Sequence, residues 1–508
     1  MLFNSWAFVF VFLPVCLFFY FNLARINIRI ASIFLVGASF AFYGYWSVRY
    51  IPLLCGSIFS NYLFGWSITH NLSRGKNKTS KYLLFAALIF NLLVLIYYKY
   101  SNFFINDINE IFSTKFSIGN VILPLGISFY TFTQIAFLVD AYKGKLKHFN
   151  FIHYCLFVTY FPHLIAGPIL HHESMIPQFE KKANYKFSME NFSFGLAWFV
   201  IGLFKKVVIA DTFSTYSDPI FGAVDAGLSP TFIVSWIGAI AFAFQIYFDF
   251  SGYSDMAIGI SKMFGIQLPI NFDSPYRANN IIAFWRKWHI SLSTFLKDYL
   301  YIPLGGSKRG ESRRYLNLMI TMILGGLWHG ASWTYVIWGI LHGLFLTINH
   351  FWIKKLQNSN RTYRISIPSS LKVTFTFLLT CMAWTFFRAS SINSASRMLE
   401  GMFLFNGISL PSFFSNYQNI FDAIHLKTSL TGIFMGIASF NMKTLFFVFL
   451  FTAVIVWGAP NTQRILQTER VHSMTTNKLV LSVVVLGFMF AASMINFSHV
   501  QTFIYFQF

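Results

Sequence analysis

Apolar segments long enough to cross a lipid bilayer recur along this chain of 508 residues. Each is close to the ~20 residues that a helix needs to span the hydrocarbon layer. Hydrophobic residues make up 56% of the sequence and charged residues only 11%, and a soluble domain could not cover so much apolar surface with so little charge. We therefore predict an all-α polytopic membrane protein. Its clearest early segments are Trp6 to Phe21, Ile30 to Trp46, Ile51 to Ile68, Tyr82 to Tyr98 and Val121 to Val139.

The basic residues lie in short loops between these segments. The chain has 38 Lys and Arg against 17 Asp and Glu, a formal net charge of +21. Such residues collect on the cytoplasmic side of membrane proteins, so topology explains most of the excess and no nucleic-acid partner is expected. The same surface could attract an anionic cytosolic donor. Three groups place the amino terminus outside: Arg25 and Arg29, then Arg74, Lys76, Lys78 and Lys81, then Lys143, Lys145 and Lys147.

The carboxyl-terminal end is also predicted to face outward. Arg464, Arg470 and Lys478 precede the final apolar segment, Leu479 to Ile495, and no Lys or Arg follows it. Residues 479–508 are expected to form the last transmembrane helix and an external aromatic ending. Two external termini imply an even number of crossings, about twelve.

The middle of the chain, from Tyr142 to Gly310, does not divide into clean spans. Backbone groups freed by helix breaks are tolerated at membrane depth only inside protein or beside water. We therefore expect re-entrant or interfacial helices around a cavity, within a single membrane-embedded domain of residues 1–508. The breaking residues are Pro162, Gly167, Pro168, Pro269, Pro275 and Pro303.

His329 is the first candidate for a catalytic base. It lies at the turn of an apolar hairpin between Tyr315 to Trp328 and Trp333 to Ile348, where a polar ring normally has a reason to be present. A neutral imidazole is well suited to accept a proton near pH 7. The alternative is a histidine whose ring nitrogens only hydrogen-bond neighbouring helices.

A second histidine, His289, follows an aromatic and basic segment. On one continuous helix Trp285, Trp288 and Leu292 would share a face and leave Arg286 and Lys287 on another, as in a helix at the membrane interface. If functional, His289 could orient the donor or hold the reacting group near His329, while Arg286 and Lys287 bind phosphates. The alternative is an ordinary membrane anchor.

Two carboxylates, Asp249 and Asp255, lie in an aromatic stretch, where each needs a cation or several donors. They could fix a histidine tautomer, but a structural pairing with an arginine is favoured. His163 lies beside a Pro and Gly break that suits a turn lining a pocket. The four cysteines lack CxxC spacing and no His or carboxylate spacing requires a metal, so neither a disulfide framework nor a metal site is predicted.

Six motifs, in order along essentially the whole chain, resemble the membrane-bound O-acyltransferase (MBOAT) family. Within it they are similar to the bacterial AlgI-like branch, which includes the membrane subunits of alginate and peptidoglycan O-acetylation. The resemblance implies a ring of about 11 to 13 tilted transmembrane helices around a tunnel. The motifs are Phe161 to Ile169, Asp249 to Asp255, Asn271 to Tyr276, Phe284 to Ser293, Asp298 to Gly306 and Gly325 to Ala331.

The resemblance also implies roles for particular residues. The essential histidine of the family corresponds to His329, its second motif histidine to His289, and Trp285 and Trp328 lie in the matching motifs. A cytosolic thioester, acetyl-CoA or an acyl carrier, would be the donor, with no bound cofactor. In this branch the bacterial inner-membrane enzyme passes acetyl outward, usually to a separate periplasmic SGNH-type transferase that modifies a polysaccharide.

The ending Phe503 to Phe508 resembles the aromatic tail of a small peptide that works with the related teichoic acid D-alanyl transferase. Tyr505 could therefore carry the acyl group as a phenolic ester, and the alternative is an interfacial aromatic anchor. Transfer of D-alanine, or acylation of a lipid or protein, also fits an acyltransferase. The rival from another class is a transporter or flippase, in which broken helices and buried charges are equally expected.

Overall fold

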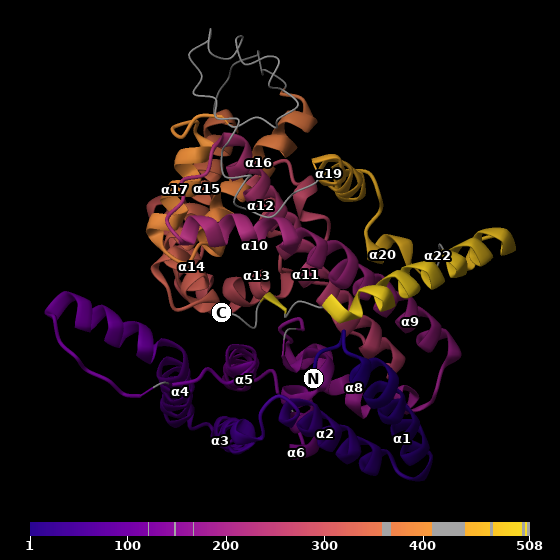
Figure 1. Cartoon of the computed structure of the whole chain (residues 1–508). Coiled ribbons are helices and arrows are strands. Elements are labelled where there is room, and N and C mark those ends of the chain that lie inside the picture. The colour runs from indigo at the N-terminus through magenta and orange to yellow at the C-terminus, as the bar shows by residue number, and fades with distance from the viewer. Residues whose placement is uncertain are drawn as a thin grey trace, which may run out of the picture.

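The computed structural model of the chain describes residues 1–119, 121–146, 149–165, 167–357, 367–408, 442–467, 471–499 and 503–504. These residues form helices and no β-strand, which confirms the all-α prediction (Figure 1). The first helices are α1 (Leu13–Ile26), α2 (Ile28–Gly44), α3 (Ile51–Ser73), α4 (Asn77–Phe112), α5 (Ile127–Tyr142), α6 (Phe151–Thr159), α7 (Phe161–Leu164), α8 (His172–Glu180), α9 (Met189–Phe204) and α10 (Asp211–Asp225). They are followed by α11 (Phe232–Met263), α12 (Ile281–Trp285), α13 (Ile290–Leu296), α14 (Glu311–His329), α15 (Trp333–Gln357), α16 (Ser369–Arg388), α17 (Ile392–Met402), α19 (Met442–Trp457), α20 (Thr462–Ile465) and α22 (Thr476–Ile495).

Shorter helical turns connect or extend these elements. Three have π-helical geometry: η1 (Ala7–Phe12), η4 (Lys205–Ala210) and η6 (Lys297–Tyr301). Four are 3-10 turns: η2 (Val48–Tyr50), η3 (Lys182–Tyr185), η5 (Pro275–Arg277) and η9 (Asn496–His499).

Eight helices in the described part of the chain are long and apolar enough to cross a membrane, which confirms a polytopic membrane protein. The fifth predicted segment begins at Ile127 rather than Val121, because Pro124 and the left-handed Gly126 (φ 71°) precede α5. The eight are Ala7–Ile26, Val48–Ser73, Asn77–Phe112, Met189–Asp225, Phe232–Met263, Trp333–Gln357, Ser369–Arg388 and Thr476–Ile495.

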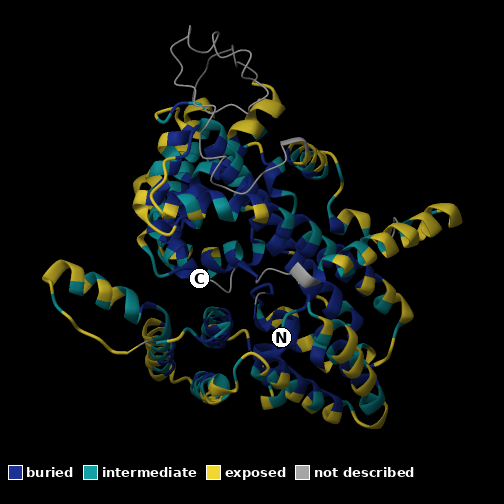
Figure 2. Cartoon of the chain, viewed as in Figure 1, coloured by how far each residue is buried: buried dark blue, intermediate teal, exposed yellow. Residues whose placement is uncertain are grey.

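The region between residues 142 and 310 is less broken than predicted. The α9–η4–α10 segment and α11 are both long helices, and α11 is mostly buried (Figure 2). A Cβ at Gly195 or Gly202 of α9 would lie 2.6 Å from the carbonyl oxygen of Gly259 or Gly252, respectively, of α11. These glycines let the two helices approach closely, as small residues do in membranes. The breaking residues named from the sequence all lie outside these long helices.

Short elements do occupy the centre, as predicted, and include α6, α7, α12 and α13. The continuous helix expected through Trp285 and Leu292 is wrong, because the chain turns at His289, which has a left-handed φ of 42°. The loop before α12 pairs with this turn: the Ile290 N–H donates to the Asn271 carbonyl at 2.9 Å. Trp285 and Leu292 are therefore on different helices.

The predicted apolar hairpin is confirmed as α14 and α15. The two helices cross at glycines, since a Cβ at Gly326 would lie 2.2 Å from the Tyr335 carbonyl oxygen and one at Gly339 would lie 2.4 Å from that of Met322. Their close contact fixes the turn that carries His329. Figure 1 shows the start of the chain near the middle of the view, while α22 projects outward and is largely exposed (Figure 2).

We predict that Gly326→Ala destabilises the protein. The added methyl group overlaps the Tyr335 carbonyl, and overpacking of this kind costs about 1 to 3 kcal/mol. The midpoint of thermal unfolding in detergent should fall. Gly487→Ala in α22 is the matched control, because a Cβ there meets nothing within 4 Å. Equal midpoints for the two variants would contradict the close α14–α15 crossing.

Candidate active site

His329 is the last residue of α14 and only 4% exposed. Its ring meets those of Trp328, Trp338 and Phe387 edge-on, with centroid separations of 5.0, 5.1 and 5.2 Å. The last two rings come from α15 and α16. The imidazole is therefore surrounded by rigid aromatic walls, which fix its orientation and keep bulk water away from its faces.

An open pocket reaches His329 from the end of the molecule opposite the basic loops. Trp46 follows α2, whose other end carries Arg29, and Gly126 precedes α5, whose other end is followed by Lys143. The empty volume is about 610 Å³, part of it open to solvent. The pocket thus leads from residue 329 to the surface of the molecule. Its lining residues are Trp46, Lys99, Leu123, Pro124, Leu125, Gly126, Ile127, Ser128, Phe129, Ile165, Trp328 and His329.

Three basic side chains are close enough to act electrostatically on His329: His289, His342 and Lys99. The predicted partner, His289, is completely buried, and its Nδ1 lies 3.2 Å from the Asn271 side-chain oxygen. The ring centroids of His289 and Trp328 are 6.3 Å apart. The structure therefore brings the rings of both predicted histidines close to the Trp328 indole.

His342 and Lys99 were not identified from the sequence. The Nε1–H of Trp285 donates to His342 Nδ1 at 3.2 Å, and the Trp338 ring contacts the imidazoles of both His329 and His342. In the sequence, His342 is only a histidine within the second arm of the hairpin, and Lys99 only a single lysine at the end of a long apolar run. Neither signal says which helix the side chain faces, so the grouping depends on tertiary packing.

Arg286 and Lys287 lie away from the pocket, toward the end with the basic loops. Arg286 is exposed and Lys287 intermediate. Arg286 acts electrostatically on His350, whose Nδ1 lies 2.7 Å from a guanidinium nitrogen of Arg314. These cations form a basic surface at that end, and binding of phosphates by it remains a prediction.

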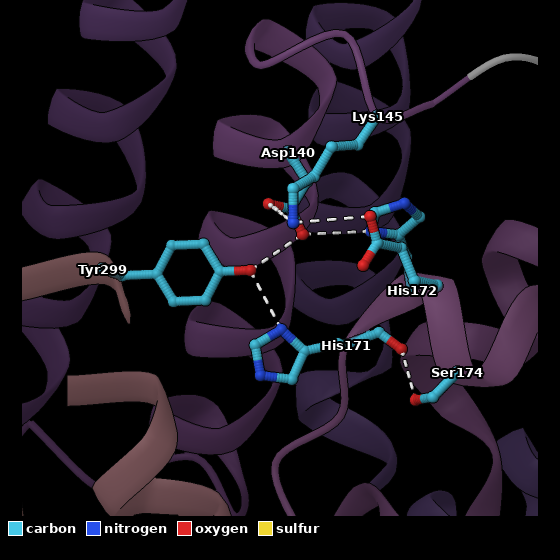
Figure 3. Close-up of polar contacts among 7 residues, drawn as sticks. Asp140, Lys145, His171, His172, Ser174 and Tyr299 are labelled. Carbon is cyan, nitrogen blue, oxygen red and sulfur yellow. Dashed lines mark hydrogen bonds and ion pairs between the residues drawn. The ribbon is translucent and has the colours of Figure 1, made fainter. Parts of the chain in front are cut away.

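A polar network closes the opposite end of α5 (Figure 3). The Tyr299 hydroxyl donates to Asp140 Oδ2 at 2.8 Å, and His171 Nδ1 lies 3.0 Å from the same hydroxyl. His172 Nδ1 and Lys145 Nζ lie 3.2 and 3.7 Å from the Asp140 carboxylate. The network therefore joins α5, the start of α8 and η6 beside the basic loop that follows α5.

The protonation states of Tyr299 and His171 in this network depend on their burial and on the nearby Asp140 carboxylate. Burial, followed by the Asp140 carboxylate, raises the pKa of Tyr299, so its hydroxyl stays protonated and able to donate. Burial lowers the pKa of His171 below its ordinary value. His171 is therefore neutral at pH 7 and adds no positive charge to the network.

A stack of aromatic rings separates the pocket from this network. Phe132 of α5 stacks on Phe295 with centroids 4.4 Å apart and on Trp328 at 5.3 Å. Ser128 and Asp140, at opposite ends of the same helix, are separated by about 18 Å along its axis. The first turn of α5, which lines the pocket, the aromatic stack and the polar network therefore follow one another in this order along the helix.

Asp249 and Asp255 pair with lysines rather than with an arginine. Lys206 Nζ lies 2.6 Å from Asp249 and 2.7 Å from Asp211, and Lys205 Nζ lies 2.6 Å from Asp255. Each buried carboxylate thus has the cation that its environment requires. A structural role explains both, and their use in substrate binding stays a prediction.

The chain end docks onto the same region. The Ile504 N–H donates to Asp249 Oδ2 at 2.9 Å, and the ring of Phe503 lies 5.8 Å from that of Phe250. Phe250 in turn meets the His289 ring edge-on at 4.6 Å. Tyr505, predicted to carry the acyl group, lies outside the described residues.

His163 is buried in α7 and is not among the groups acting on His329. Its ring faces Tyr160, with centroids 6.1 Å apart. The pocket is lined instead by Ile165, two positions further along. A direct part for His163 in substrate binding stays a prediction.

Comparison with known proteins gives consistent matches. The sequence profile described as MBOAT, membrane-bound O-acyltransferase family, matches residues 40–396. The peptidoglycan O-acetyltransferase of Helicobacter pylori is 39% identical over 539 aligned positions, which cover 100% of this chain and 98% of that protein. The probable alginate O-acetylase AlgI of Pseudomonas aeruginosa is 41% identical over 410 positions, covering 80% and 75%. The teichoic acid D-alanyltransferase of Bacillus subtilis is 29% identical over 282 positions, covering 53% and 69%.

We predict that Lys206→Met strongly destabilises the protein, because it leaves two buried carboxylates without their shared cation. Breaking a buried ion pair from one side costs about 3 to 5 kcal/mol. The thermal midpoint should fall, and the double variant Lys206→Met with Asp249→Asn should recover part of the loss. A single variant as stable as the wild type would show that the pair does not hold this region.

Proposed function

Because this chain belongs to the membrane-bound O-acyltransferase family, we propose that it moves acetyl groups from a cytosolic thioester across the bacterial inner membrane for O-acetylation of an extracytoplasmic polysaccharide. The placement of His329 carries the proposal. This imidazole lines the pocket, and two further histidines, His289 and His342, are close enough to act on it electrostatically.

His329 acts as the general base in this proposal. An acceptor hydroxyl attacks the carbonyl carbon of the thioester and transfers its proton to the imidazole. The tetrahedral intermediate then expels the donor sulfur as a thiolate, which receives the proton back. A positioned base contributes about 100- to 10,000-fold to such a step. His289, whose ring also lies close to Trp328, helps to hold the reacting group.

The donor is proposed to come from the side of the basic loops, which is cytoplasmic by the positive-inside rule. Arg286 and Lys287, near Arg314, would bind the phosphates of acetyl-CoA or the phosphate of an acyl carrier. The pocket beside Trp46 and Gly126 then faces outward. This arrangement supports an outward transfer, and we propose that both termini face outward.

The chain end supports a relay on the outer side. The contacts of Ile504 and Phe503 anchor the segment that immediately precedes Tyr505, next to Phe250 and the ring of His289. We propose that Tyr505 accepts the acetyl group as a phenolic ester and presents it to a periplasmic SGNH-type transferase. A relay divides one long transfer into two shorter ones.

Acetyl transfer is preferred to D-alanyl transfer for this chain. The peptidoglycan O-acetyltransferase match covers the whole chain, whereas the D-alanyltransferase match covers about half. Peptidoglycan and alginate are the polymers named for the relatives. An acetylated cell-wall or exported glycan is therefore the proposed final product.

We predict that His329→Ala lowers acetyl transfer by about 100- to 10,000-fold because the base is lost, while expression and thermal stability stay close to wild type. Transfer is measured with purified protein and radiolabelled acetyl-CoA. His70→Ala, which removes a histidine at the far end of α3, is the control and should retain activity. Full activity of His329→Ala would remove the central assignment.

We predict that Tyr505→Phe abolishes labelling of the chain by radiolabelled acetyl-CoA, because the ring is kept and only the nucleophilic hydroxyl is lost. Label on the wild-type chain should be released by alkali, as expected of an ester. His329→Ala should block labelling as well, since no base remains to form the ester. Undiminished label on the Tyr505→Phe chain would exclude the relay without affecting the role of His329.

A further inference from the structure

Lys99 is a cation within the membrane-spanning helix α4. It lies 18 positions beyond Lys81 of the basic loop, or about 27 Å along the helix, which is near the full ~30 Å of the hydrocarbon layer. No carboxylate lies within 4.0 Å of its ammonium among the residues that the structure places. Its side chain is only partly exposed and its ammonium contacts the end of α14, so Lys99 is more than a cation at the membrane boundary.

One role of Lys99 is to cap the C-terminal end of α14. The Lys99 ammonium donates to the carbonyl oxygens of Trp328 and His329 at 2.5 and 3.2 Å. The neighbouring Tyr100 hydroxyl donates to the Leu327 carbonyl at 2.8 Å. The last carbonyls of a helix lack intrahelical partners and favour a nearby cation. Lys99 therefore holds the backbone of the proposed base.

Capping alone does not explain why the group is charged. Tyr100 makes an equivalent bond with a neutral hydroxyl one residue along the chain. A lysine adds a net positive charge, and here that charge lines the same pocket as His329. The position therefore fits a place where negative charge appears during the reaction.

A second feature of the pocket favours an anion at the same point. Gly126, Ile127 and Ser128, the beginning of α5, line the pocket beside Lys99, and the Ser128 hydroxyl oxygen lies 3.5 Å from the ammonium. The beginning of a helix carries a partial positive charge. A negative oxygen in the pocket would thus meet a lysine, a hydroxyl and the positive end of a helix together.

We propose that Lys99 is a further catalytic residue, which together with Ser128 binds the negatively charged oxygen of the acyl-transfer intermediate. This inference rests on the function proposed above. When the acceptor oxygen bonds to the acetyl carbon, the carbonyl electron pair moves onto its oxygen while His329 takes the acceptor proton. The ammonium stabilises that oxygen until the pair returns to carbon and the C–S bond to the donor breaks. No proton leaves Lys99 in this step.

The test compares Lys99→Met with Tyr100→Phe. Both remove a bond to the end of α14, but only the first removes the charge. We expect Lys99→Met to lower kcat for acetyl transfer on the order of 100- to 1,000-fold with an almost unchanged KM for acetyl-CoA, and Lys99→Arg to retain part of the rate. Tyr100→Phe should retain most of its kcat. Equal losses in Lys99→Met and Tyr100→Phe would reduce Lys99 to a helix cap and overturn the proposal.

Two donor analogues give a readout that a purely structural role would not change. A methylphosphonate analogue of acetyl-CoA is tetrahedral and negatively charged at the reacting group, whereas the acetonyl analogue is planar and neutral. We expect Lys99→Met to weaken binding of the phosphonate on the order of 100-fold and to leave the ketone unaffected. Equal weakening of both analogues contradicts the proposal. A wild-type protein that transfers no acetyl group would instead refute the proposed function itself.

Discussion

A helix that ends within a membrane protein leaves its last backbone carbonyls without intrahelical partners. Lipid offers no hydrogen-bond donors, so other parts of the chain must supply them. α14 stops in this way at His329. Tyr100 and Lys99 of α4 supply the donors for its last carbonyls, and Gly326 lets α15 pack directly against it. The backbone that carries the imidazole is thus held by two helices distant in sequence, so the site exists only when the N-terminal helices and the hairpin have assembled.

α5 links the two ends of the proposed reaction path. Its first turn lines the pocket, Phe132 stacks against Phe295 and Trp328 in the middle, and Asp140 belongs to the polar network at the other end. Along the helix, the stack of three aromatic rings thus lies between the turn that lines the pocket and the polar network.

Features set by local sequence were predictable, and features set by contacts between distant segments were not. Apolar runs of the right length identified the α14–α15 hairpin, and a polar ring at its turn identified His329. The helix expected through Trp285 and Leu292 failed because pairing with Asn271, a distant loop residue, turns the chain at His289. The sequence shows Lys99 beside an apolar run, but only packing shows that it faces the end of α14.

Asp249 and Asp255 illustrate how a charge in an apolar helix can serve assembly. Six positions on α11 place them about 120° apart around the helix, so two lysines can serve them separately: Lys206 pairs with the first and Lys205 with the second. Each carboxylate has a further donor from the C-terminal part of the chain, the Ile504 N–H and the Thr462 hydroxyl, at 2.9 and 2.7 Å. Neutralising either lysine would therefore also loosen the chain end. Placement of the proposed relay residue thus depends on the ion pairs of α11, although none of these charges needs to touch a substrate.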